Sequence, residues 1–487
     1  MEGEIGLDIV KKRAVKGVAV LTGRTLLLNL VSFISQGFLW AFLNPSQFGV
    51  FLIVSATVNF LSYFADIGLG AALIQKKEKP EEEDYRTVFT VQEILVLTIL
   101  VIILLLGPVL AGKYSLNHEG LMLLYALGGS FFLASLKNIP SIMLERKLEF
   151  GKFIIPQVLE NMVYSVAVVF FAWRGFGITS FTYAVLIRGV VGLVAIYILN
   201  PWKPGIAFSL KSFKNLIKFG IPYQLNNFLA TVKDDGMTIV LGGILGTAGV
   251  GILGTAQKLA QYPLRFFMDN VTKVTFPAFS RMQDDKKELE KSLSRSIFFI
   301  CALVFPSLVG LVIVFPVLIT IIPKYAKWSP AYIPLIFLSV NSLWAAASTQ
   351  LTNFLNSVGK IKTTFKLMIM WTALTWALVP FLSVKFGVNG AAFSYLLIGS
   401  SSVVVFYIVK RQLNWAIYRS VIVPLLASLV MGVILFILRG ILPINKATTL
   451  LTLIFMGGLA YLGSLYLVLG GTLFEDVKKI YLSIFQK

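Results

Sequence analysis

Charged and polar side chains recur inside long apolar stretches of this sequence. The clearest set lies between residues 258 and 273, where the spacing is three or four residues throughout; its members are Lys258, Tyr262, Arg265, Asp269 and Lys273. On a helix this spacing places all of them on one face. A charge within a membrane span costs about 2.5–3.5 kcal/mol on insertion scales. The pattern therefore predicts a face that lines water, a ligand or a partner helix rather than lipid.

Other apolar stretches carry similar residues. The basic residues at membrane depth are Arg24, Lys137, Arg188, Lys233, Lys258, Arg265 and Lys273. The acids at the same depth are Glu160, Asp234, Asp235 and Asp269. Uncharged polar residues accompany them, including Gln157, Asn161, Asn227, Thr231, Thr238, Asn341, Ser348 and Thr352. Because bases outnumber acids and arginine makes forked bonds to phosphate oxygens, the set favours an anionic ligand.

The same charges also have a structural interpretation. They could neutralise one another in interhelical pairs that hold a bundle together, for example Lys258 or Arg265 with Asp234. Charges this numerous at membrane depth favour a functional role for the set as a whole.

Several kinds of chemistry are not indicated. His118 is the only histidine and lies in a short loop, and Cys301 is the only cysteine and lies in the apolar run IFFICALVF. The glycines of GGILGTAGVG (242–251) are not followed by the GKS or GKT of a phosphate loop, so close helix packing and a tight turn explain them better. The mixed-charge run KKEKPEEEDYR (76–86) is expected to be a solvated loop. We therefore expect no enzyme, no catalytic residue, no metal and no cofactor.

The elements that position these residues follow from composition. With 57% hydrophobic and 14% charged residues, the 487-residue chain is not a soluble domain. Its apolar segments predict an all-α polytopic membrane protein with about fourteen transmembrane helices. Their approximate limits are 17–43, 48–74, 87–111, 119–144, 154–173, 177–199, 217–245, 248–280, 296–323, 330–358, 364–384, 388–409, 418–438 and 447–471.

The distribution of charge predicts the orientation. The chain has 43 Lys+Arg and 23 Asp+Glu, a formal net charge of +20. Roughly 29 of the basic residues fall in loops on one side of the predicted spans and about seven on the other. By the positive-inside rule the protein is multi-pass in the cytoplasmic (inner) cell membrane with both termini cytoplasmic. The same rule accounts for the basic excess, so nucleic acid is not an expected partner.

An internal repeat with an offset near 200 residues predicts two parallel six-helix bundles plus two C-terminal helices. For example, Phe48-Gly49-Val50 corresponds to Ala248-Gly249-Val250. The expected organisation is a cytoplasmic amphipathic lead (1–16), an N-terminal bundle (17–199), a cytoplasmic linker (200–216), a C-terminal bundle (217–411), and helices 13 and 14 with a cytoplasmic tail (412–487).

Two segments carry a resemblance to a known family. NPSQFGVFLIVSATVNFLSYFADIGLGAALIQKK (44–77) and LERKLEFGKF (144–153), together with the basic lead and the fourteen predicted helices, resemble the polysaccharide-transporter branch of the multidrug/oligosaccharidyl-lipid/polysaccharide exporter superfamily. Its members are Wzx-type flippases, which move undecaprenyl-pyrophosphate-linked oligosaccharide from the cytoplasmic to the outer leaflet. The resemblance implies two lobes around a cationic central cavity that works by alternating access.

Type and spacing, rather than a family motif, suggest roles in such a cavity for the candidate residues. Those expected to bind substrate are Arg24, Asn227, Lys233, Lys258, Tyr262 and Arg265. The acids Glu160, Asp234, Asp235 and Asp269 are candidates for Na⁺ or H⁺ coupling. The glycan would be a repeat unit of O-antigen, exopolysaccharide or teichuronic-acid type. Expected partners are the lipid-linked oligosaccharide and the bilayer, with a polysaccharide polymerase and chain-length machinery as further candidates.

Two alternatives remain at this point. A multidrug cation antiporter of the same superfamily should have a net acidic cavity, which disagrees with the basic excess. A membrane-embedded polysaccharide polymerase or acyltransferase should show a large external loop or a buried His/Asp/Arg constellation, and neither is visible in the sequence.

Overall fold

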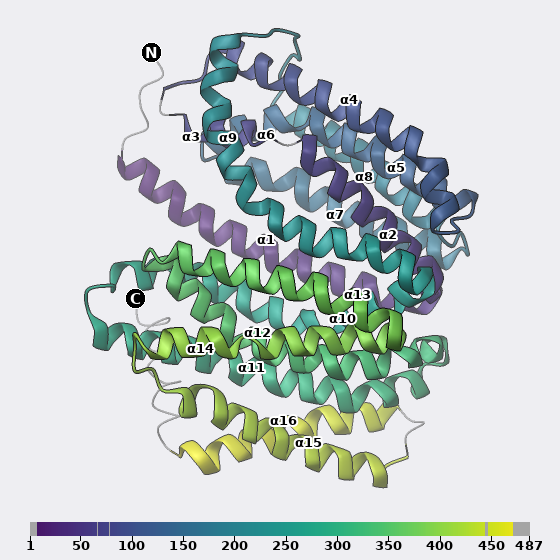
Figure 1. The fold of residues 1–487 in the computed structure, drawn as a ribbon, viewed down its shortest axis with the longest axis vertical. Coiled ribbons are helices and arrows are strands. Elements are labelled where there is room, and N and C mark those ends of the chain that lie inside the picture. Colours follow the sequence, from purple (N-terminus) through teal and green to yellow (C-terminus); the bar gives the residue numbers. More distant parts are fainter. Residues whose placement is uncertain (1–6, 66, 77, 444–446, 471–487) are drawn as a thin grey trace. The chain divides into compact units, whose positions relative to one another are not determined.

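The fold was analysed in a computed structural model that describes residues 7–65, 67–76, 78–443 and 447–470 (Figure 1). These residues are almost entirely helical and contain no strand. The chain forms two compact units, Met1–Gly251 and Ile252–Lys487. Within the described ranges, 12 helical runs are long and apolar enough to cross a membrane. The predicted all-α polytopic membrane fold is confirmed.

Two of these runs are much longer than one membrane crossing. Phe228–Asp269 has 42 residues and Ile361–Lys410 has 50, whereas one crossing needs about 20. Each run contains a glycine with a positive, non-helical φ angle, 67° at Gly246 and 60° at Gly387. The predicted limits 245/248 and 384/388 fall on these glycines. Each run is thus long enough to cross twice, and the total of fourteen spans stays a prediction.

The first unit is built from eleven helical elements and the start of a twelfth, as far as the described residues go. They are α1 (Leu7–Phe42), α2 (Pro45–Ser62), η1 (Tyr63–Ala65), α3 (Leu69–Gln75), α4 (Glu82–Lys113), α5 (His118–Leu136), α6 (Asn138–Arg146), α7 (Phe150–Trp173), α8 (Thr179–Leu199), α9 (Leu210–Thr231), η2 (Val232–Gly236) and the beginning of α10 (Met237–Arg281). Helix α8 packs against both α5 and α7, and α1 packs against α7. This arrangement brings together charged residues from the end of α5, from α7 and from α8.

Two predicted spans are divided in the structure. The span predicted at 48–74 is broken between α2 and α3, and the span predicted at 119–144 is broken between α5 and α6. At the first break Gly68 has φ 75° and its backbone crosses that of Gly220 in α9. A Cβ on Gly68 would lie 2.4 Å from the Gly220 carbonyl oxygen, so only glycine permits this crossing.

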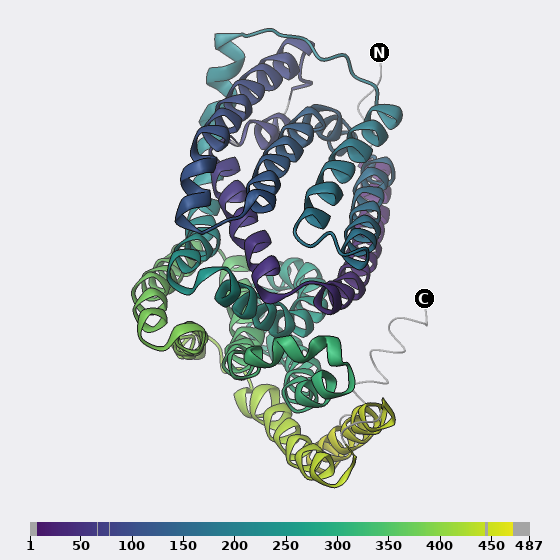
Figure 2. The same cartoon turned by 90° about the vertical axis from the view of Figure 1, so that its right-hand side faces the viewer.

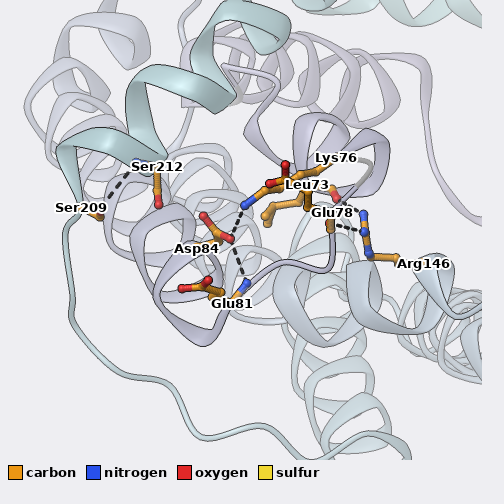
Figure 3. A network of polar contacts seen from close by, with 8 residues as sticks. All are labelled: Leu73, Lys76, Glu78, Glu81, Asp84, Arg146, Ser209 and Ser212. Carbon is orange, nitrogen blue, oxygen red and sulfur yellow. Dashed lines mark hydrogen bonds and ion pairs between the residues drawn. The ribbon is translucent and has the colours of Figure 1, made fainter. Parts of the chain in front are cut away.

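A polar network at this end of the unit joins the two segments that carry the family resemblance (Figure 3). Arg146 donates from Nη1 to the Leu73 carbonyl oxygen at 2.7 Å and from Nη2 to that of Glu78 at 2.7 Å, so it caps the carboxyl end of α3. Nearby, Lys76 Nζ and Asp84 Oδ2 form an ion pair at 2.6 Å. The prediction of a solvated loop at 76–86 is wrong for its last part, because Asp84 is buried and lies in α4.

The segment between α8 and α9 is hydrogen-bonded to side chains of α4 next to this network. The backbone N–H of Ser209 donates to Thr87 Oγ1 at 3.1 Å, and that of Ala207 donates to Thr90 Oγ1 at 3.1 Å. Trp202 donates from its indole nitrogen to Glu82 Oε1 at 3.2 Å. The predicted linker 200–216 therefore lies against α4 up to residue 209, and its remaining residues, 210–216, already belong to α9.

The start of α2 and the part of α10 that follows its kink at Gly246 make a reciprocal contact within the first unit. Ser46 Oγ lies 2.8 Å from Thr247 Oγ1. A Cβ on Gly49 would lie 1.7 Å from the Thr247 carbonyl oxygen, and one on Gly251 would lie 1.8 Å from the Pro45 carbonyl oxygen. These glycines thus allow direct contact between backbones, which confirms the packing interpretation of GGILGTAGVG.

The second unit contains the remainder of α10 and eight further elements in its described part. They are α11 (Lys286–Ile321), η3 (Pro323–Ala331), α12 (Tyr332–Ser357), α13 (Ile361–Ser400), α14 (Val403–Lys410), η4 (Tyr418–Ile422), α15 (Val423–Ile441) and α16 (Ala447–Leu469). Helix α11 packs against α12 and α15, and α15 lies beside α16 (Figure 2). Cys301 is fully buried in α11, as its apolar surroundings predict.

Candidate functional site

Glu160 lies at the centre of a buried ion cluster in the first unit. Its Oε1 is 2.5 Å from Lys137 Nζ at the end of α5, and its Oε2 is 3.7 Å from Arg188 Nε in α8. The side chains of Glu160 and Lys137 are only 10% and 15% exposed, whereas that of Arg188 is 43% exposed. The cluster therefore joins three helices and leaves one positive charge in excess at its more exposed end.

The position of this carboxylate depends on a glycine of α8. Gly192 lies one helical turn beyond Arg188, and a Cβ there would be 1.8 Å from Glu160 Oε1. The Arg188 guanidinium also stacks over the ring of Tyr164, with 5.8 Å between its central carbon and the ring centroid. The local sequence thus fixes the acid against α8 and turns the arginine across an aromatic face.

Arg24 lies in α1, which packs against α7. Its side chain is half-buried. Its Nε atom is buried and has no hydrogen-bond partner among the described residues. A buried donor without a partner is costly unless something supplies an acceptor. Arg24 is therefore the described residue best suited to donate a hydrogen bond to an anionic group.

The short π-helix η2 carries three of the predicted residues. Lys233 Nζ forms an ion pair with Asp234 Oδ1, and Asp235 hydrogen-bonds to the side chain of Asn59 in α2. Thr238 donates to the Asp234 carbonyl oxygen at 2.9 Å. The side chain of Asn227 lies outside the described residues. A π-helical turn inside a longer helix is often found at functional sites.

The second unit holds the other predicted residues along α10. Lys258, Tyr262 and Asp269 are half-buried and Arg265 is exposed. The helix is continuous from residue 247 to residue 281, so the predicted single face is confirmed for these four. The side chain of Lys273 lies outside the described residues.

A polar cluster between α10 and α12 was not among the predicted site residues. Gln350 is fully buried; its Nε2 donates to Thr272 Oγ1 at 3.0 Å, and Thr275 Oγ1 lies 3.3 Å from its Oε1. Asn353 Nδ2 donates to Thr275 Oγ1 at 3.1 Å. On α12 the polar residues predicted to lie at membrane depth are instead Asn341, Ser348 and Thr352. The Thr-x-x-Thr spacing at 272–275, facing Gln-x-x-Asn at 350–353, could have indicated this pairing.

The structure therefore distributes the predicted set over both units. It brings Glu160 together with Lys137 and Arg188, two residues predicted to lie at membrane depth but not among the predicted site residues. It pairs Asp234 with Lys233. Whether these residues bind substrate or a coupling ion stays a prediction. In the described ranges no group of His, Cys, Asp and Glu side chains could hold a metal ion.

Comparison with known proteins identifies the family. A family model described as "Polysaccharide biosynthesis protein" matches residues 39–333. The chain is 22% identical to the succinoglycan biosynthesis transport protein ExoT of Rhizobium meliloti (strain 1021), over 82% of this chain and 79% of that protein. It is 24% identical to the teichuronic acid biosynthesis protein TuaB of Bacillus subtilis (strain 168), over 88% of this chain and 89% of that protein.

A solved structure has the same fold. The lipid II flippase MurJ in an inward closed conformation superposes with a TM-score of 0.77 at 16% identity, covering 93% of this chain and all of that one. At this identity the likeness concerns the fold alone. Since the family model matches more than half of its length, the chain belongs to the polysaccharide biosynthesis protein family, as the two sequence segments at 44–77 and 144–153 predicted.

Proposed function

We propose that this protein is a flippase, not an enzyme, that moves an undecaprenyl-pyrophosphate-linked oligosaccharide from the inner to the outer leaflet of the cell membrane. The observation that carries the proposal is the similarity over most of both chains to proteins named for the transport of succinoglycan and for teichuronic acid biosynthesis. The fold shared with a protein named a lipid II flippase supports it.

The charged residues at membrane depth give this proposal a physical mechanism. The lipid tail stays in the bilayer while the pyrophosphate leaves water, so cations must replace its lost hydration. Arg24, with its buried and unpaired Nε, and Lys258 and Arg265 on one face of α10 are the residues that we expect to do so. Lys233, Asn227 and Tyr262 complete the proposed substrate set.

The membrane potential favours outward movement of the anionic substrate. We place both termini and the basic loops in the cytoplasm, in accordance with the positive-inside rule. Carrying about two negative charges outward across an inside-negative membrane is then favoured by about 2.3 kcal/mol per charge per 100 mV. Asp234, Asp235, Asp269 or Glu160 could bind Na⁺ or H⁺ during the return step. The polymerase and chain-length machinery would act on the product at the outer face.

The experiment is a flipping assay with purified protein in vesicles that contain labelled undecaprenyl-pyrophosphate-linked oligosaccharide. The test variant is Lys258→Gln/Arg265→Gln. Each charge-assisted bond contributes about 1.5–3 kcal/mol, so losing two should slow flipping by at least about 100-fold. The matched control is Lys366→Gln/Arg411→Gln, which removes the same two charges from exposed positions of the same unit and should flip normally.

Two results would contradict the proposal. One is normal flipping by the test variant when both variants insert and unfold like the unmodified protein. The other is efflux of an organic cation by the unmodified protein with no movement of the lipid-linked sugar, which would make it a multidrug antiporter.

A further inference from the structure

The second unit contains a basic cavity that the proposed transport function does not use. Its volume is about 570 Å³, within the usual range for small-ligand sites. One wall is the beginning of α11 and the other is the segment 414–420, which precedes α15. None of the residues that we assign to substrate binding lines it.

The walls of the cavity are fixed to each other by hydrogen bonds. The backbone N–H of Asn414 donates to Glu290 Oε1 at 2.5 Å, and that of Ala416 donates to Ser294 Oγ at 3.0 Å. Ser420 Oγ donates to the Ser294 carbonyl oxygen at 2.9 Å. Between these residues the fully buried Trp415 anchors the segment. The cavity is therefore part of the folded unit and not a gap between loose loops.

The lining is strongly cationic. Lys287, Lys291, Arg295 and Arg419 face a single acid, Glu290, whose Oε1 already accepts the Asn414 N–H. Lys291 pairs with Glu288 at 3.3 Å, but both side chains are more than half exposed, so water screens this pair. The lining thus has a net charge of +3 and should concentrate an anion with several oxygen acceptors.

The cavity also lies where two membrane spans begin. Directly after Arg295, α11 becomes apolar, and Phe298 from this stretch contributes to the lining. After Arg419, η4 and α15 become apolar and expose large side chains such as Leu426 and Leu429. Tyr418, beside Arg419, is 65% exposed, as is common for aromatic residues at the level of lipid headgroups.

We propose that this cavity binds the phosphate headgroup of an anionic membrane phospholipid from the leaflet that faces these basic loops. Arginine and lysine would contact the phosphate oxygens while the acyl chains follow the exposed apolar surface of the adjoining spans. A basic pocket at the end of membrane helices is a typical site for such headgroups. The apolar surroundings favour a lipid over a free phosphate ion.

The test measures lipid binding to the full-length protein in neutral detergent by native mass spectrometry. Phosphatidylglycerol is titrated against phosphatidylcholine with the same acyl chains, and inorganic phosphate is added as a competitor. We expect phosphatidylglycerol to bind preferentially and to resist displacement by millimolar phosphate. Arg295→Gln/Arg419→Gln should weaken its binding about thirtyfold, from about 1 kcal/mol for each basic residue.

The matched control is Arg281→Gln/Arg411→Gln, which removes two exposed arginines outside the cavity and should bind phosphatidylglycerol normally. Lys287→Gln/Lys291→Gln provides a second test variant, because neither lysine side chain is buried. Unchanged phosphatidylglycerol binding in both test variants would overturn the proposal. So would displacement by low phosphate concentrations, which would identify a free phosphate site, or binding of an acidic peptide in place of the lipid. Binding is measured without flipping, so the result is independent of the proposed function.

Discussion

Glu160 is held by two cations, and this arrangement determines what its removal should do. Lys137 and Arg188 approach opposite oxygens of one buried carboxylate. Taking away one member of a buried pair leaves the others without compensation, which costs more than the pair contributes. If the carboxylate serves mainly to neutralise these cations, the single substitution should therefore destabilise the fold more than the paired substitution does.

We predict that Glu160→Gln lowers the free energy of unfolding by about 3 kcal/mol and that Lys137→Met/Glu160→Met restores more than half of this loss. The physical reason is that the paired change removes both buried charges. Thermal unfolding in detergent measures it, with a thiol-reactive dye reporting on exposure of Cys301. If the paired variant is less stable than Glu160→Gln, the carboxylate is not neutralised mainly by Lys137.

Gly192 offers a second test of the same site. Gly192→Ala should displace the Glu160 carboxylate, because the new Cβ would lie 1.8 Å from Oε1, and should destabilise the protein by about 3 kcal/mol, as removing the acid does. The control is Gly129→Ala in α5, where the Cβ would meet only Leu186 Cδ2 at 3.9 Å. Equal melting temperatures for the two alanine variants would contradict the close contact at Gly192.

At the scale of elements, the short helix α3 depends on a residue far along the chain. Arg146 donates to the carbonyl oxygens of Leu73, Ile74 and Glu78, the first two of which belong to the last turn of α3. A helix of 7 residues is not stable alone, so this cap and packing against α9 hold it.

Arg146→Ala should therefore release the carboxyl end of α3 and cost about 1–3 kcal/mol, with faster proteolytic cleavage within 76–86. Arg146→Lys should restore only part of the loss, since an ammonium group cannot reproduce the fork of a guanidinium. Lys147→Ala, an exposed change next in the chain, is the control. Full protection by lysine would show that charge alone, without the fork, is sufficient.

Sequence predicted some element boundaries and missed others for a physical reason. The breaks at Gly246 and Gly387 were predicted because apolar character pauses there and glycine permits a positive φ. The break after α2 was missed because α3 is itself largely apolar, so hydropathy continues across it. The break after α5 was missed because it is a single residue, Lys137, and the apolar residues Ile139, Ile142 and Leu144 of α6 continue the pattern beyond it. The separation of α2 from α3 depends on the packing of α3 against α9 and on the Gly68–Gly220 crossing, which involves residues about 150 positions apart.

At the scale of the whole molecule, the site too could be predicted in part from the sequence, and the rest depends on how the helices pack. Hydropathy and spacing placed Glu160, Lys137 and Arg188 at membrane depth, and the α10 residues on one face. They could not specify that Glu160 meets both cations, because that depends on how α5, α7 and α8 pack. The pairing of Gln350 with Thr272 and Thr275 was missed for the same reason.

The proposed transport cycle makes a prediction for the contact between α2 and α10. In Ser46→Cys/Thr247→Cys the two sulfur atoms should come within bonding distance, since the native oxygens are 2.8 Å apart. If α2 and α10 must separate at this contact during flipping, oxidation should stop transport and reduction should restore it. Buried Cys301 should not compete, and the two single-cysteine variants are controls. An oxidised, cross-linked protein that flips at the normal rate would show that this contact stays closed.

The same contact has a consequence for symmetry. Ser46 contacts Thr247, the Thr247 carbonyl packs against Gly49, and the Pro45 carbonyl packs against Gly251. Each side of the contact thus contributes one glycine and one carbonyl group to the other. This reciprocity has the form of a contact between two identical subunits around a two-fold axis, although here both sides belong to one chain. A side chain at either glycine would therefore push apart both pairs of backbone groups at once.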